Sequence, residues 1–64
     1  MTIPEAREYV GKSCWVSWTD RLGQEHSKVV QVEDLQFVPL YGAYLIGDTE
    51  EVLLDKVTQI RPLD

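Results

Sequence analysis

The sequence predicts a mostly-β domain, a small five-stranded, strongly bent antiparallel sheet or barrel that follows a short N-terminal helix. The chain of 64 residues has room for one domain at most. A chain of this length buries only about 60% of the surface that its unfolded form exposes, so we expect it to fold alone but marginally. From residue 13 onward, apolar residues alternate with polar ones, which is typical of strands. Turn residues interrupt this alternation every few positions, and strong bending or closure protects the edges of so small a sheet.

The first ten residues predict a helix over about residues 3–10. Thr2 is suited to cap its N-terminus, and Glu5 completes a capping box three residues later. Pro4 stands where its missing N–H is harmless, and Gly11 is suited to end the helix in the left-handed conformation. A helix of this length is marginal in isolation, so we expect its apolar side to dock on the sheet.

Two strands, at about 13–20 and 24–32, are expected to pair as a hairpin around a turn that ends at Gly23. Trp15 and Trp18 lie three positions apart on the first strand and therefore on opposite faces. Trp18 shares its face with apolar residues and is assigned to the core. Trp15 lies among serine and threonine residues and is a candidate for the surface.

The rest of the chain divides into shorter pieces. Glu33 and Asp34 interrupt the alternation of the second strand, and Pro39 suits a strand end because it donates no hydrogen bond. Residues 54–57 have the pattern of one helical or 3₁₀ turn. The remaining strands are expected at about 35–38, 43–46 and 51–54, with a final short strand at 58–61.

Charge and cysteine content restrict the partners and the compartment. Eleven Asp and Glu against six Lys and Arg give a formal net charge of −5, which repels phosphate and favours a basic partner surface. Cys14 is the only cysteine, so no disulfide can form within the chain, and with His26 it cannot fill a four-coordinate zinc site. We therefore expect a cytoplasmic protein with no metal or cofactor. We expect no membrane span, because no apolar stretch approaches ~20 residues. We also expect no signal peptide, because the N-terminus has no apolar h-region behind a basic start.

The sequence predicts that the protein is not an enzyme. His26 has neither a nucleophile nor an orienting acid on its expected face, so it is interpreted as a surface histidine. Cys14 has no basic neighbour on its face and is interpreted as a small buried residue. The acidic residues do not follow the D-x-D-x-D-G pattern of a calcium loop.

Aromatic and acidic residues are the candidates for a binding surface. Trp15 is either an interface anchor or, as we prefer, the surface on which the N-terminal helix packs. Tyr41 and Tyr44 flank a turn, where aromatic rings either bind a peptide or a base or pack the hairpin. The acidic residues either are solvated at turns or form a negative rim that docks on a basic surface. The predicted partner-binding residues are Trp15, Phe37, Tyr41, Tyr44, Glu33, Asp34, Asp48, Glu50 and Glu51.

The order of helix, hairpin, middle strands and the segment VLLDKV at residues 52–57 is similar to the small SH3-like and Sm-like barrels of bacterial regulators. It resembles the Rof type of Rho-termination inhibitor, a short acidic protein with an N-terminal helix on an Sm-like barrel. It also resembles the last segment of WYL domains through Ala43-Tyr44-Leu45, with Ala43 in place of an aromatic and Lys28 or Lys56 in place of a ligand-contacting Arg. The first resemblance implies an RNA-handling protein as the partner.

These features predict a non-catalytic cytoplasmic adaptor or regulator that binds a larger, basic protein surface through an acidic rim and an aromatic patch. The alternative is a single-stranded RNA- or DNA-binding barrel. Its predicted contact residues are Trp15, Tyr41, Tyr44 and the cations Lys28, Lys56 and Arg61. A self-associating structural subunit is a third hypothesis, because Sm-type barrels form rings through their edge strands.

Overall fold

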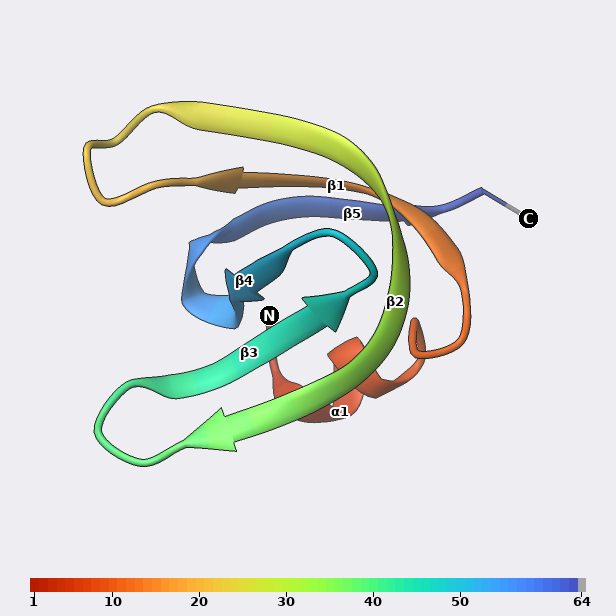
Figure 1. Ribbon diagram of the computed structural model, residues 1–64, viewed down its shortest axis with the longest axis horizontal. Coiled ribbons are helices and arrows are strands. Elements are labelled where there is room, and N and C mark those ends of the chain that lie inside the picture. Colours follow the sequence, from red (N-terminus) through yellow and green to blue (C-terminus); the bar gives the residue numbers. More distant parts are fainter. Residues whose placement is uncertain (64) are drawn as a thin grey trace.

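The computed structural model describes residues 1–63 and contains one short α-helix and five strands in a single antiparallel sheet. The strands are ordered β4-β3-β2-β1-β5, and each neighbouring pair is antiparallel (Figure 1). The prediction of a mostly-β domain with a five-stranded antiparallel sheet is therefore confirmed, with two of the six expected strand ranges joined in one strand. In chain order the elements are α1 (Ile3–Arg7), β1 (Ser13–Thr19), β2 (Glu25–Val38), β3 (Gly42–Gly47), β4 (Glu51–Leu53), the 3₁₀ turn η1 (Leu54–Lys56) and β5 (Val57–Pro62).

The long strand β2 causes the bend of the sheet. Its first half pairs with β1 and its second half, from Val32, pairs with β3, so both halves of the sheet share one strand. Figure 1 shows β2 curving around one side of the molecule between the β1–β5 pair and the β3–β4 pair. Among residues 1–63, β4 and β5 do not pair, so the sheet is strongly bent but not closed.

A β-bulge lies near the middle of β2, where the register against β3 shifts between Val32 and Asp34. Bulges bend a strand and increase its twist. The prediction that Glu33 and Asp34 separate two strands is therefore wrong. The polar pair instead occupies the bulge of one continuous strand, because both side chains are exposed there and need no place in the core. The other predicted strand ends lie within one residue of those observed, and the turn predicted at 54–57 is η1.

The core lies between the two halves of the sheet. Trp18 packs at its margin and Cys14 is fully buried, as the alternation predicted. Gly47 of β3 lies close against the first half of β2, since a Cβ at this position would overlap Val30 Cγ1. The fully buried hydrophobic residues are Ala6, Cys14, Val16, Val30, Val32, Leu45, Val52 and Leu54.

Helix α1 is shorter than predicted. The capping box is present, because the Thr2 hydroxyl accepts the Glu5 backbone N–H at 3.3 Å and the Glu5 carboxylate accepts the Thr2 backbone N–H at 3.3 Å. After the helix the chain turns to Gly11, which has φ 90° and donates its N–H to the Val32 carbonyl at 2.8 Å. Where the sequence predicted the last helical turn, the chain forms tighter turns instead, in which Tyr9 and Val10 donate their N–H groups to the Ala6 and Arg7 carbonyls.

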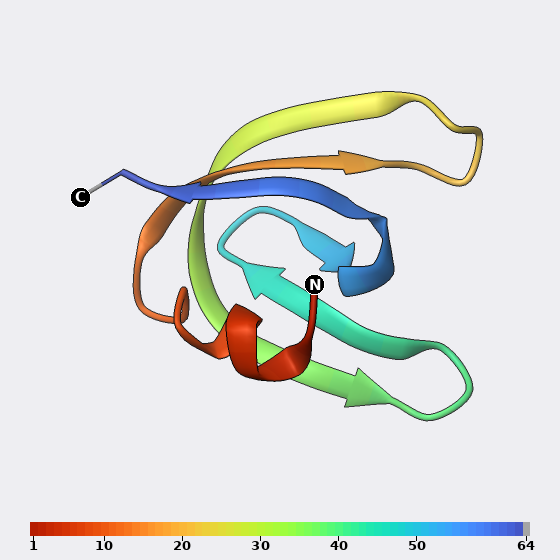
Figure 2. The same ribbon diagram turned by 180° about the vertical axis from the view of Figure 1, so that it is seen from behind.

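Helix α1 docks beside the second half of β2, on the core side of the sheet. Ala6 is fully buried in the core, and Ile3 borders a depression next to Leu35 of β2. Figure 2 shows the helix beside β2 and on the other side of the molecule from β1 and β5. The preferred expectation that the helix covers Trp15 is therefore wrong. Trp15 alternates with the core residue Cys14 and projects from the opposite face of β1.

Candidate functional site

Negative charge is concentrated in one half of the molecule. Residues 29–55 contain six of the eleven acidic residues and none of the six Lys and Arg. They run from the middle of β2 through β3 and β4 into η1, and are called the acidic segment below. The rest of the chain carries the other five acidic residues and all six Lys and Arg. The negative net charge therefore originates in the acidic segment, and its field favours a positively charged partner.

The outer face of the acidic segment places carboxylates beside an apolar side chain. Ile46 of β3 has a paired residue on each neighbouring strand. These are Asp34 on β2 and Glu51 on β4. Residues directly opposite in antiparallel strands project to the same face. The half-buried Ile46 is therefore flanked by two exposed acidic residues.

The next row of the same face is aromatic and apolar. Tyr44 of β3 lies between Gln36 of β2 and Leu53 of β4, and both Tyr44 and Leu53 are half-buried. Tyr44 and Ile46 are two positions apart on β3 and hence share a face. We call this surface the Tyr44–Ile46 face. It consists of Asp34, Gln36, Tyr44, Ile46, Glu51 and Leu53.

The Tyr44–Ile46 face contains three predicted binding residues, Asp34, Tyr44 and Glu51. Sequence reasoning missed Ile46 and Leu53. The alternation of β3 carried the signal for Ile46, because it follows Tyr44 by two positions, but the apolar stretch around it was interpreted only as a short strand. Leu53 carried a similar signal, because it follows Glu51 by two positions, but only the register of β4 against β3 places it beside Tyr44.

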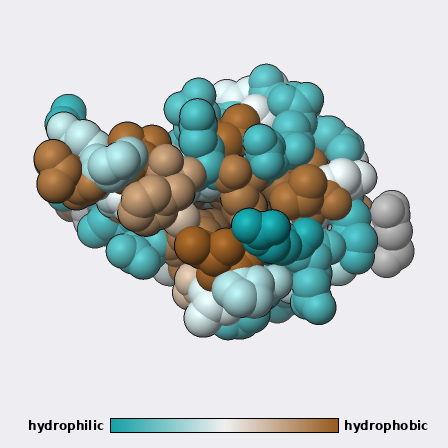
Figure 3. All heavy atoms as spheres, turned by 90° about the horizontal axis from the view of Figure 1, so that it is seen from below, coloured by the Kyte–Doolittle hydropathy of each residue, from teal (hydrophilic) through white to brown (hydrophobic). Residues whose placement is uncertain are grey.

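The hairpin between β2 and β3 is apolar and exposed. Tyr41 donates its N–H to the Val38 carbonyl at 3.1 Å, which closes a β-turn through Pro39 and Leu40. Tyr41 is 69% exposed and Leu40 is wholly exposed. Figure 3 views the molecule from below and shows hydrophobic atoms gathered between the hairpin end and the middle of this side. The end of the hairpin is thus an exposed apolar loop, in which Leu40 was not among the predicted binding residues.

Phe37 lies on the other face of this hairpin from Tyr44. It is paired with Ala43 and borders the depression beside Ile3, so it projects to the side on which the helix packs. Its side chain is 67% exposed. Phe37 and Tyr44 therefore belong to different surfaces and do not form one aromatic patch.

Two predicted rim residues have structural contacts. Asp48 accepts the Gln31 backbone N–H at 3.1 Å and donates its own N–H to the Gln31 carbonyl at 3.1 Å, which ties the β3–β4 loop to β2. Glu50 forms an ion pair with Lys28 at 3.4 Å. Glu33 is exposed in the bulge. The predicted acidic rim is thus divided, with Asp34 and Glu51 on the Tyr44–Ile46 face and Asp48 and Glu50 engaged with β2.

Trp15 belongs to a separate surface, formed by β1, β2 and β5. Val29 and Arg61 lie directly opposite Trp15 on its two neighbouring strands, and the Arg61 guanidinium carbon lies 5.9 Å from the centre of the indole ring. Leu63 lines the same shallow groove and is 54% exposed, as is Val29. A cation over an indole ring is an attractive contact. This contact places an aromatic and a cationic group together on an exposed surface.

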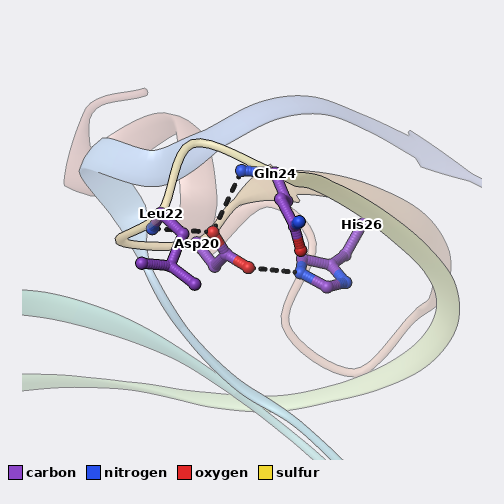
Figure 4. Close-up of polar contacts among 4 residues, drawn as sticks. All are labelled: Asp20, Leu22, Gln24 and His26. Atoms are coloured by element: carbon purple, nitrogen blue, oxygen red, sulfur yellow. Dashed lines mark hydrogen bonds and ion pairs between the residues drawn. The ribbon is translucent and has the colours of Figure 1, made fainter.

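His26 is exposed, as predicted, but it has a partner. Its Nε2 lies 2.8 Å from an Asp20 carboxylate oxygen, and its ring stacks on Trp18 with 5.8 Å between the ring centres. The other Asp20 oxygen accepts the backbone N–H groups of Leu22 and Gln24 at 2.8 and 3.0 Å (Figure 4). The hydrogen bond from His26, followed by those backbone groups, lowers the pKa of Asp20. This cluster secures the β1–β2 turn.

Comparison with protein-family models, with curated protein sequences and with solved structures found no match. Residues 1–63 contain no group of three or more His, Cys, Asp or Glu side chains placed to hold a metal ion. None of the helical segments in this part of the chain is both apolar and long enough to cross a bilayer. The candidate site therefore rests on the geometry of the Tyr44–Ile46 face.

Proposed function

We propose that this protein is a non-catalytic adaptor or regulator that binds a larger protein with a basic surface through the Tyr44–Ile46 face. The observation that carries this proposal is the register that places Asp34 and Glu51 on either side of Ile46, with Tyr44 in the next row. Interfaces combine an apolar centre with a polar rim, and tyrosine is enriched at their energetic centres.

The charge distribution supports a basic partner. The acidic segment contains no Lys, Arg or His, and the two charged residues of the Tyr44–Ile46 face, Asp34 and Glu51, are both acidic. Opposite charges at the rim of an interface accelerate association and fix the orientation of the partners. They contribute less to the lifetime of the complex, which the apolar centre determines.

For the fold we propose an open barrel of the SH3-like or Sm-like type. The single strand β2 shared by both halves of the sheet supports it, as does η1 directly before β5. The resemblance to Rof-type regulators points to an RNA-handling protein as the partner, and the lone cysteine favours the cytoplasm as the compartment.

The proposal is tested by capturing partners on the immobilised protein at low and at high salt. We expect a partner that is released as salt rises, because screening weakens exposed charge pairs. Glu51→Gln removes one rim charge and should weaken binding about two- to fivefold. Glu8→Gln removes the same charge from the end of α1, outside the acidic segment, and should leave binding unchanged. Capture that depends neither on salt nor on Glu51 would contradict the proposal.

A second candidate function is single-stranded nucleic-acid binding on the Trp15 surface. It is favoured by the Arg61 guanidinium over the Trp15 ring, since aromatic stacking and cations together bind single strands. Titration of the tryptophan fluorescence with single-stranded oligonucleotides tests it. Quenching at low salt that Arg61→Gln abolishes would support this function, and the absence of any change at low salt would remove it.

A further inference from the structure

Leu40, at the end of the β2–β3 hairpin, has an unfavourable backbone conformation and an unfavourably exposed side chain. Its φ is 75°, and among residues 1–63 the other residues with positive φ are glycines. Its side chain is wholly exposed. With Pro39 before it and the Tyr41 N–H closing the turn, Leu40 occupies the third position of a type II turn, where glycine or asparagine is favoured.

The turn requires a left-handed conformation at this position, but folding does not explain why an exposed leucine occupies it. A left-handed conformation is strained for a residue that carries a Cβ, and glycine would remove the strain. A wholly exposed leucine side chain gains nothing from the hydrophobic core, and it adds apolar surface in water. Strained backbone positions cluster at ligand-binding and switch sites, where the surrounding structure holds them in place.

We propose that Leu40 is an apolar anchor that inserts into a hydrophobic pocket of the partner protein, a pocket bordered by basic side chains. This inference rests on the proposed function and names the chemistry that the partner must present. Leu40 belongs to the same hairpin as the Tyr44–Ile46 face, so one partner can contact both. The turn is already fixed by Pro39 and by the hydrogen bond that closes it, which reduces the entropy lost on binding.

The charges around the hairpin favour a protein over a lipid surface or a second copy of the chain. Loops and helices that enter membrane surfaces combine apolar residues with cations, which attract anionic lipids. The acidic segment has no cation to offer. A symmetric pairing through this hairpin would bring two acidic segments together, which like charges disfavour. A basic protein surface is the occupant that matches both the leucine and the carboxylates.

Photo-crosslinking in the cells that produce the protein tests the position of the partner. A benzophenone side chain is introduced at Leu40, at Tyr44, or at Leu22, which is 79% exposed in the β1–β2 turn and serves as the matched control. We expect one shared adduct from positions 40 and 44, and none from position 22. An adduct from position 44 without one from position 40 overturns the anchor and leaves the proposed function intact. The absence of adducts from both positions contradicts both proposals.

The purified adduct partner then provides the quantitative measurement. Leu40→Gly suits the backbone and should keep or raise the urea midpoint, while it weakens the affinity about tenfold or more, as expected for an anchor residue. Leu22→Ala should change the affinity by less than about twofold. Unchanged affinity in Leu40→Gly overturns the anchor. Leu40-dependent binding to phosphatidylcholine or phosphatidylserine vesicles, or Leu40-dependent dimers in sedimentation, overturns the choice of a protein pocket.

Discussion

The close approach of Gly47 to Val30 leads to a quantitative prediction about the bend of the sheet. A Cβ on Gly47 would overlap Val30 Cγ1 and would lie 3.3 Å from the Glu50 carbonyl oxygen. Overpacking of this kind costs about 1–3 kcal/mol, so Gly47→Ala should lower the free energy of unfolding by that amount. A domain of this length is expected to have a free energy of unfolding of roughly 3–10 kcal/mol, so a loss of this size is measurable.

A double-mutant cycle distinguishes this contact from a general defect. Val30→Ala alone should cost about 2 kcal/mol, from the lost methyl groups and the cavity. In Gly47→Ala/Val30→Ala the new methyl occupies part of that cavity, so the double variant should be at least about 1 kcal/mol more stable than the sum of the single effects. The contact with Glu50 remains, so the recovery is incomplete.

The assay is urea unfolding followed by tryptophan fluorescence, with equal slopes required for all variants. Val52→Ala combined with Gly47→Ala is the control. Val52 is also buried, but none of its atoms is among the three nearest to the added methyl. The stability losses of Val52→Ala and Gly47→Ala should therefore add within about 0.5 kcal/mol. Additive effects for the Gly47 and Val30 pair would refute the close approach of β3 to the first half of β2.

Three further substitutions test local interactions by the same unfolding assay. The pKa of Asp20 is lowered in the folded state, so its contribution is present above its usual value of 3.8 and is lost as the pH falls through the lower folded value. The stability difference between the protein and Asp20→Asn should therefore shrink below about pH 4, and a constant difference would contradict the lowered pKa of Asp20. Thr2→Ala should cost about 1 kcal/mol by removing the capping box, and no loss would show that α1 does not depend on it. Ser17→Ala should cost about 1–3 kcal/mol, because the buried Ser17 hydroxyl joins the Glu25 carboxylate at 2.6 Å and the Thr58 hydroxyl at 3.0 Å. A neutral result there would contradict the buried hydrogen bonds.

Much of the fold is predictable from local pattern, because capping, turns and alternation act over a few residues. Thr2 and Glu5 predicted the helix start, and the alternation around Cys14 predicted the buried face of β1. The bulge at Glu33 and Asp34 could not be predicted, since an interrupted alternation describes a bulge and a strand break equally well. Only the pairing of β2 with β3 on both sides of that position separates the two.

The candidate site was less predictable because it depends on contacts between distant residues. The sequence indicated which aromatic residues were candidates, but register decided that Tyr44 and Phe37 face opposite ways. The helix was expected over Trp15 because an apolar stripe needs a surface. It docks on the core side beside β2 instead, where Gly11 pairs with Val32. The strain at Leu40 had no sequence signal, since a Pro-Leu pair is compatible with several turn types.

The central claim is that the Tyr44–Ile46 face and its hairpin bind a basic protein surface. The most direct test is the change in backbone amide chemical shifts of the isotope-labelled protein when the purified partner is added. The account predicts that the largest changes fall between residues 32 and 53, around Tyr44 and Leu40, and that they diminish as salt rises. Changes centred instead on Trp15 and Arg61, with the acidic segment unaffected, would contradict it.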